Sequence, residues 1–214
     1  MMKIEYLSKG MPKQLTDHKG KLFKSGISKD SANELEVSSG YITGDEVANH
    51  DFHGGRDRVL CVYPFEHYQN WETEFGKTLI QPAFGENLTV TGMREDEICI
   101  GDQLQIGSVL AEVSQGRYPC VTINRHTGID QLLARIIETG YTGYFLRIIK
   151  PGTIRKQDSI SIVNRTASMT VADIHHTFFH NRKDTDAIRR ILQIQSLADD
   201  WKKKFEKLLE RTQE

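Results

Sequence analysis

Short apolar segments separated by Gly, Asp and Asn dominate the chain up to about residue 165, and this pattern predicts strands rather than long helices. Several of these segments are rich in β-branched residues, which pack well on a pleated surface. Gly101-Asp102 and Gly107-Ser108 predict tight turns between strands. The expected strands cover residues 3–8, 58–63, 97–100, 103–106, 109–114 and 159–163.

Two helices are expected to interrupt the strands and to pack on the outside of the sheet. The first follows Pro64, places Tyr68 and Trp71 at helical spacing, and stops at Gly76. The second covers residues 130–140 and ends on a glycine, which adopts the left-handed cap conformation easily.

The period changes beyond residue 168, where three short helices are expected. Thr170 and Asp173 fit a capping box for the first helix, Asp184 or Thr185 begins the second, and Ser196 lies at the start of the third. The sequence therefore predicts the α+β class.

The expected division is a β-barrel domain over residues 1–165, followed by a small three-helix domain over residues 166–214.

Composition narrows the class of protein. A hydrophobic content of 38% and a charged content of 27% suit a soluble globular protein, and we expect neither a membrane span nor a secretory signal. Cys61, Cys99 and Cys120 form an odd set without paired spacing, so we expect reduced thiols and a cytoplasmic location. A net charge of -1 disfavours nucleic-acid binding.

A glycine pair in a basic segment is the first candidate site. His53-Gly54-Gly55 is followed by Arg56 and Arg58, so backbone amides and cationic side chains lie together as they do where phosphate binds. A plain hairpin turn with a solvated charge cluster is the other interpretation. A zinc site at His50-x-x-His53 is weaker, because no further ligands follow at the usual spacing.

Gly85-Glu86-Asn87 lies in a second polar loop. A carboxylate and an amide side by side can match the donors and acceptors at the edge of a heterocycle. Spacing alone favours an ordinary turn here.

Cys120 follows the expected strand 109–114 and stands three residues after Arg117. A neighbouring cation lowers the pKa of a thiol and favours the thiolate, which binds soft metals. A buried, inert cysteine is the commoner alternative. Cys61 and Cys99, each between aliphatic residues, suit that alternative better.

Three motifs together resemble the YiiM group of MOSC-domain proteins. They are His-Gly-Gly-x-Asp-Arg at residues 53–58, Pro-Ala-Phe-Gly-Glu-Asn-Leu at residues 82–88 and Ser-Gln-x-Arg-x-Pro-Cys at residues 114–120. The resemblance extends to residues 24–29, to residues 40–45 and to the C-terminal helices. It departs from the group at Gly116 and Arg56, where proline is frequent, and this puts loop geometry and substrate range in doubt.

The resemblance implies a molybdenum cofactor, a pterin with a phosphate tail, held by the thiolate of Cys120. Cys120, His53 and Glu86 become candidate catalytic residues, with His126 as a further candidate proton donor. The remaining candidates would bind the cofactor, and they are Lys24, Ser25, His53, Gly54, Gly55, Arg58, Gly85, Glu86, Asn87, Ser114, Gln115 and Arg117.

By the same resemblance, the protein reduces small N-hydroxylated compounds, such as N-hydroxylated purine bases, to the amine. The sequence contains neither of the common glycine-rich nucleotide motifs, so the implied electron donor is a separate NAD(P)H-dependent flavin or iron–sulfur reductase. The three-helix domain is a candidate docking surface for that donor, and a homodimer stays open. Two alternatives remain: a sulfur carrier or transferase that uses a Cys120 persulfide, and a non-catalytic carrier of the cofactor.

Overall fold

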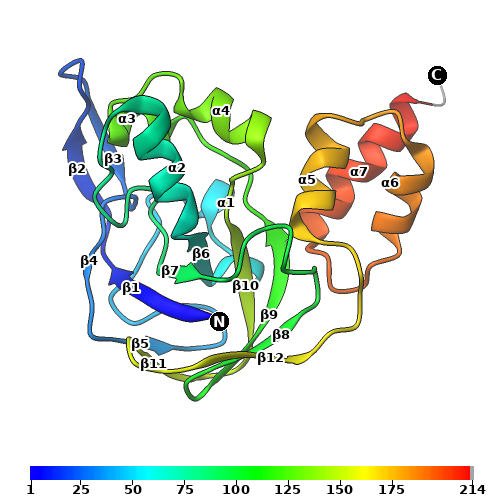
Figure 1. Ribbon diagram of the computed structural model, residues 1–214, viewed down its shortest axis with the longest axis horizontal. Helices are drawn as coiled ribbons and strands as arrows, with labels where there is room; N and C mark the ends of the chain where they lie inside the picture. Colours follow the sequence, from blue (N-terminus) through cyan, green and yellow to red (C-terminus); the bar gives the residue numbers. More distant parts are fainter. Residues whose placement is uncertain (213–214) are drawn as a thin grey trace.

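The computed structural model describes residues 1–212, except for the side chains of Asp51 and Phe52. Predictions that fall on those two side chains or on residues 213–214 lie outside the described residues. Figure 1 shows a curled sheet with helices packed above it and three further helices to one side. The predicted α+β class, a barrel-like sheet followed by a three-helix unit, is confirmed, and the sheet forms a half-barrel.

Eight strands form the main sheet in the order β12-β8-β9-β10-β6-β7-β1-β4. Neighbouring strands are antiparallel except β6 and β7, which run parallel. Two small ribbons, β11-β5 and β2-β3, complete the described strands. Their bounds are β1 Lys3–Lys9, β2 Lys13–Thr16, β3 Leu22–Ser25, β4 Asp30–Ser31, β5 Glu34–Val37, β6 Leu60–Pro64, β7 Leu88–Thr91, β8 Gln103–Ile106, β9 Val109–Gly116, β10 Tyr144–Lys150, β11 Gly152–Arg155 and β12 Ile160–Asn164.

The helices fall into groups that flank the sheet differently. Helices α2 to α4 lie above one end of the sheet, and α5 to α7 pack beside β9 (Figure 1). Their bounds are α1 His50–His53, the 3-10 helix Arg56–Arg58, α2 Glu66–Phe75, α3 Thr122–Thr127, α4 Leu132–Thr139, α5 Val171–Phe179, α6 Thr185–Leu192 and α7 Asp199–Arg211. No described helix is long and apolar enough to cross a membrane.

Local signals predicted several helix boundaries well, but α7 begins at Asp199, three residues after the predicted start at Ser196. The helix after Pro64 ends at Gly76 and the next predicted helix ends at Gly140, both with a left-handed glycine cap. The capping box of Thr170 and Asp173 is present at the start of α5. Helix α3 was not predicted, although it begins two residues after Cys120.

One expected strand is wrong. Residues 97–100 form turns and a single isolated bridge between Cys99 and Thr170. Ile98 and Ile100 are buried as a strand would bury them, but their backbone groups pair with the linker before α5. The alternation of apolar residues in 97–100 therefore arises because Ile98 and Ile100 are buried near the three-helix unit, and not because the segment is a strand of the sheet.

Two apolar clusters hold the molecule together. The larger one fills the half-barrel and continues into the three-helix unit through Ile174, Ile188 and Phe205. The smaller one packs α2 to α4 around Trp71 and Phe84. The chain segment that carries Cys120 runs between these two clusters, because it connects β9 to α3.

Candidate functional site

Cys120 lies in the short loop that joins the end of β9 to the start of α3. Its side chain is half-buried, and the neighbouring Tyr118 and Val121 side chains are 51% and 58% exposed. The Sγ atom lies 3.3 Å from Oγ1 of Thr122, the first residue of α3. The thiol is therefore accessible from solvent, whereas Cys61 and Cys99 are buried.

The pKa of Cys120 is lowered to about 6, so the thiolate predominates at neutral pH. The largest cause is a hydrogen bond from the side chain of His53, and it outweighs the opposing effect of partial burial. The hydroxyl and backbone N–H of Thr122 lower the pKa further. His53 is the last residue of α1, so the fold brings together two predicted site residues that are far apart in the sequence.

Arg117 does not have the role that its spacing suggested. Its Nη1 lies 3.8 Å from the sulfur of Cys61, and its backbone N–H donates to the carbonyl of Gly143. Burial raises the pKa of Cys61, and Arg117 offsets part of that rise. The largest effects that lower the pKa of Cys120 come from His53 and Thr122, so the sequence-based explanation of that thiolate, which rested on Arg117, is corrected to these two residues.

A hollow of about 210 Å³ adjoins the segment that carries His53. It is lined by Gly54, Gly55, Arg56, Asp57, Arg58, Gln115 and Asp200. The backbone of Gly55 has a φ of +112°, which favours glycine, and no atom lies within 4 Å of the position that a Cβ would take. Backbone groups and cationic side chains therefore face one space, as the phosphate interpretation of this turn expects.

Gln115 is the most informative residue of this hollow. Its side chain is 2% exposed, yet among the described residues its Oε1 has no hydrogen-bond partner. Buried polar atoms of folded proteins nearly always have a partner, so an unpaired amide oxygen at a hollow indicates a place for a ligand that donates a hydrogen bond.

Asp200 belongs to the same hollow, and the sequence did not identify it. It lies in the first turn of α7 and pairs with Arg58, although 142 residues separate the two. A second, adjoining hollow of about 280 Å³ is lined by Ser39, Arg56, Asp57, Arg147 and Ile148.

Glu86 is sealed in the interior. Its Oε1 accepts hydrogen bonds from the Tyr68 hydroxyl at 2.5 Å and from Thr89 at 2.8 Å, and its Oε2 accepts from the backbone N–H of Phe84 at 3.1 Å. Burial raises its pKa, and these hydrogen bonds limit the rise. The carboxyl group holds the 83–89 loop against α2 and does not open onto the surface.

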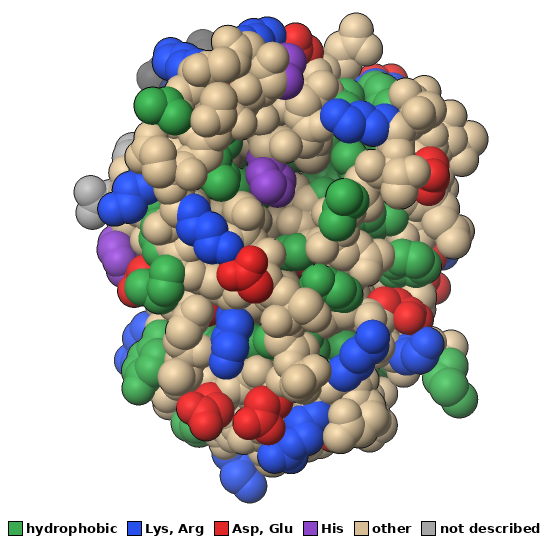
Figure 2. Space-filling model, turned by 90° about the vertical axis from the view of Figure 1, so that its left-hand side faces the viewer, with side chains coloured by type: hydrophobic (Ala, Val, Ile, Leu, Met, Phe, Trp, Pro, Cys, Tyr) green, Lys and Arg blue, Asp and Glu red, His purple; other side chains and the backbone are tan. Residues whose placement is uncertain are grey.

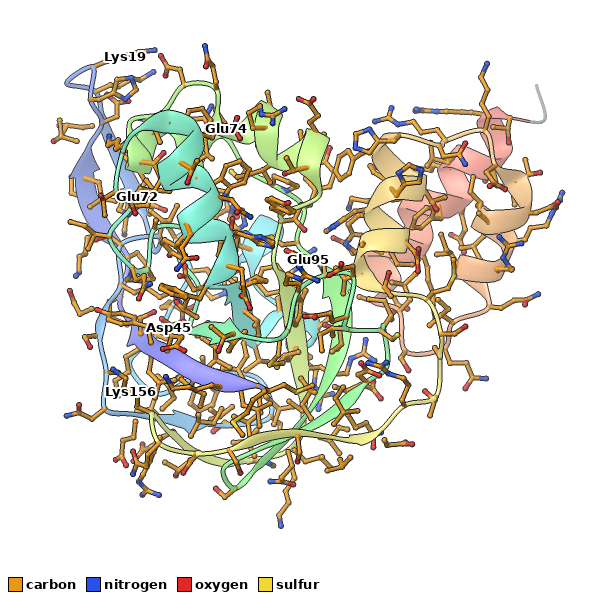
Figure 3. All side chains as sticks on the ribbon, viewed as in Figure 1. Lys19, Asp45, Glu72, Glu74, Glu95 and Lys156 are labelled. Carbon is orange, nitrogen blue, oxygen red and sulfur yellow. The ribbon has the colours of Figure 1, made fainter. Side chains whose placement is uncertain are left out.

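Asn87 and Gly85 fix the same loop from the other side. The Asn87 amide accepts from the backbone N–H of Cys61 and donates to the carbonyl of Ser8 and to Asp45. A Cβ on Gly85 would lie 3.0 Å from the side chain of Ile27. Figure 3 labels Asp45 beside β1, where the loop meets the N-terminal strands.

The other predicted residues are dispersed. The Lys24 side chain is exposed on the β2-β3 ribbon, and the Oγ of Ser25 accepts from the backbone N–H of Ile27. His126 is half-buried on α3, and burial lowers its pKa. Figure 2 shows that basic and acidic side chains are interspersed on the face that carries this ribbon.

The three-helix unit is hydrogen-bonded to β9, the strand that leads to Cys120, and packs against it. The backbone N–H of Ala198 donates to the carbonyl of Ser114, and Nε1 of Trp201 donates to the carbonyl of Gly116 at 2.9 Å. The ring of His175 packs directly on Gly116, where a Cβ would come within 2.4 Å of Nε2. The close approach explains why glycine at position 116 suits this chain.

Among the side chains that the structure describes, which leave out Asp51, no group of three or more His, Cys, Asp and Glu residues could enclose a metal ion. His50, half of the weak zinc motif, instead lies 3.4 Å from Glu46. A metal held by one protein thiolate, with its other ligands supplied by a cofactor, is compatible with this arrangement.

Comparisons with known proteins agree on the family. Residues 49–161 match the family model described as MOSC domain, and residues 169–212 match the model described as YiiM-like, 3-alpha helix domain. The chain is 34% identical over 207 residues to YflK of Bacillus subtilis (strain 168), which covers 96% of this chain and 93% of YflK.

A solved structure and a longer relative extend the comparison. The crystal structure of YiiM from Geobacillus stearothermophilus matches with a TM-score of 0.84 and 30% identity, covering 98% of this chain and 100% of that one. A protein of Gibberella moniliformis named as a reductase is 38% identical over 131 residues, which are 58% of this chain and 23% of that protein. The chain therefore belongs to the MOSC-domain family, among the members that carry the YiiM-like three-helix domain.

Proposed function

We propose that this protein is a molybdenum-cofactor-dependent reductase of small N-hydroxylated compounds. The observation that carries the proposal is the half-exposed Cys120 thiolate, stabilised by His53 and Thr122. The residues that follow His53 in the sequence, Gly54 and Gly55, line a hollow together with two arginines and two aspartates. Family membership and the relative named as a reductase support the same class of reaction.

The residues present fit such a cofactor. A thiolate is a suitable ligand for a soft metal. The unpaired amide oxygen of Gln115 suits an N–H donor of a pterin ring, and Arg58 with the Gly54-Gly55 backbone suits an anionic group. When bound, the cofactor would supply the two-electron redox chemistry that amino-acid side chains lack.

The protein's own contribution would be to bind, orient and supply protons. The overall reaction takes up two electrons and two protons, converts an N–OH group to N–H and releases water. His53 carries a ring N–H at the sulfur of Cys120 and is exposed, so it is placed to exchange protons with solvent. Tyr118 and Val121, two exposed side chains near Cys120 in the sequence, would offer apolar surface to the rest of a substrate.

Electrons would come from a separate reductase. The sequence has neither common nucleotide-binding motif, so we propose a flavin or iron–sulfur protein that uses NAD(P)H as the partner.

Metal and pterin analysis of protein made in a cofactor-producing host tests the proposal. We expect about one molybdenum per chain in the wild type and in Cys99→Ala, whose thiol is buried elsewhere, and a loss of molybdenum in Cys120→Ala. Loaded, chemically reduced wild type should then reduce N-hydroxylated purines, hydroxylamines or amidoximes. Tight molybdenum retention without any of these activities would contradict the enzyme and favour a carrier.

The same thiolate also suits a sulfur carrier, because a half-exposed thiolate with a pKa of about 6 can attack the outer sulfur of a donor persulfide, take up that sulfur atom and release the donor as a thiolate. Intact mass spectrometry separates the two functions. A stable gain of one sulfur at Cys120 without molybdenum would favour the sulfur carrier.

A further inference from the structure

Asp200 is a carboxylate in a hollow whose other charged side chains are mostly cationic. It comes from α7, whereas Gly54, Gly55 and Arg58 belong to the MOSC domain. Its side chain is 53% exposed, while the Arg58 side chain is only 14% exposed. The three-helix unit therefore places a solvent-accessible negative charge against an arginine whose side chain is largely buried.

Asp200 has a second cation within reach. The Nζ of Lys204, one helical turn further along α7, lies 3.5 Å from its Oδ2. Desolvation would raise the pKa of Asp200, but Lys204 and Arg58 together keep that pKa below its ordinary value. If Asp200 leaves Arg58, Lys204 is still within reach to neutralise its carboxylate.

We propose that Asp200 is a displaceable counter-ion: it neutralises Arg58 in the ligand-free protein, and an anion of the phosphate class takes its place when the hollow is occupied. The inference deepens the proposed function, on which it rests for the identity of the natural ligand. The three-helix unit then belongs to the binding site and sets its affinity for anions.

The physical reason is competition between two anions for one guanidinium. An arginine fork binds a carboxylate or a phosphate with similar geometry, but it cannot serve both fully. A carboxylate that stays within a few ångströms of a bound anion also repels it. Linkage requires the reverse effect as well: a bound anion weakens the Asp200–Arg58 contact between the two domains by the same factor.

Binding of inorganic pyrophosphate to the metal-free protein, measured by calorimetry at low salt, tests the proposal. Asp200→Asn removes the competing charge and should tighten binding by about three- to thirtyfold. Asp199→Asn removes one charge from the neighbouring position, which does not line the hollow, and should leave the affinity within about twofold of the wild type. The gain in Asp200→Asn should shrink at 0.5 M salt, because screening weakens charge effects and not packing effects.

A double-mutant cycle locates the competition at Arg58. Arg58→Gln should weaken pyrophosphate binding strongly, and adding Asp200→Asn to it should restore no more than about twofold. Weaker binding in Asp200→Asn would mean that Asp200 positions Arg58 and would overturn the competition. Equal effects of the two aspartate variants, or no pyrophosphate binding by wild type and Asp200→Asn alike, would also overturn it.

Comparing pyrophosphate binding by protein made with and without the cofactor identifies the source of the anion. If the natural ligand is the phosphate of the cofactor, protein from a cofactor-producing host should no longer bind pyrophosphate, whereas a site for free phosphate should bind it equally with or without cofactor. Failure of the proposed function would appear as absent molybdenum or absent reduction. The pyrophosphate measurements use metal-free protein, so they decide the role of Asp200 independently.

Discussion

We call Cys120, His53 and the hollow lined by Gly54, Gly55 and Gln115 the mouth of the site. The polar groups of the mouth and the polar groups of the 83–89 loop differ in which partners satisfy them. At the mouth, the Cys120 thiolate depends on an exposed histidine and a helix start, and Gln115 has an amide oxygen without a partner within the described residues. In the loop, every oxygen of Glu86 is bonded to protein groups and the side chain is fully buried. The unpaired amide oxygen supports our proposal that the first region accepts a ligand, whereas the bonded carboxylate of the second region supports the fold.

The largest expected effect is a loss of stability, and it should follow from a substitution in the 83–89 loop, which we call the sealed region because Glu86 is fully buried there. Glu86→Ala leaves the Tyr68 hydroxyl, the Thr89 hydroxyl and the Phe84 N–H without their acceptor, so unfolding should become easier by about 3–5 kcal/mol. Urea unfolding measures the change. Glu74→Ala is the matched control: its exposed pair with Arg135 should cost at most about 1 kcal/mol. Equal losses in the two variants would remove the distinction between sealed and surface carboxylates.

His175, which is buried in α5 against Gly116, gives the stability of the protein a pH dependence. Burial lowers its pKa to about 4, from an ordinary value of 6.5. Between those two values the unfolded chain binds a proton that the folded protein excludes, so stability present above pH 6.5 should fall by about 3 kcal/mol as the pH reaches 4.

Urea unfolding across this pH range tests whether stability falls, as expected, when the pH decreases. His175→Gln should flatten the dependence, and His176→Gln, at an exposed position, should leave it unchanged. A dependence that survives in His175→Gln would assign it to other groups. One such group is the buried Glu95, which Figure 3 labels: burial acts to raise its pKa, but His67, whose Nε2 lies 2.6 Å from Oε2, lowers it below its ordinary value.

Gly116→Ala probes the joint between the two domains and should cost about 1–3 kcal/mol, because its Cβ would collide with the His175 ring. Gly40→Ala, where no atom lies within 4 Å, should be nearly neutral. Thermal unfolding of both variants measures the difference. A neutral Gly116→Ala would show that the three-helix unit does not press on the strand before Cys120.

The smallest effect on stability should come from the mouth, where the readout is reactivity. In wild type, the alkylation rate of Cys120 with iodoacetamide should rise with pH around a midpoint of about 6. His53→Ala removes the largest cause of the lowered pKa, so the midpoint should rise by about one to two units while the unfolding free energy changes by less than about 0.5 kcal/mol. An unchanged midpoint would assign the thiolate to Thr122 alone.

The sequence predicted helix ends reliably where residues within one turn determine them. Gly76 and Gly140 end helices because glycine takes the left-handed cap, and Thr170 with Asp173 begins α5 through a capping box within one turn. Cys120 could be selected from sequence too, because its motif is contiguous.

The wrong inferences have a shared cause. Arg117 and Cys120 are close in sequence, but the backbone of the loop turns the guanidinium toward Cys61 on β6. Residues 97–100 alternate like a strand, but they pack against the linker that precedes α5. Spacing along an irregular segment does not tell which way a side chain points.

The sequence by itself determined the family motifs, the helix ends and the identity of the reactive cysteine. Only the tertiary structure decided that His53 lowers the pKa of Cys120, that Glu86 is sealed in the interior, and that Asp200 faces Arg58. Each of these depends on chain segments that meet across long sequence separations. The strand order and the docking of the three-helix unit set those meetings, and no local pattern encodes them.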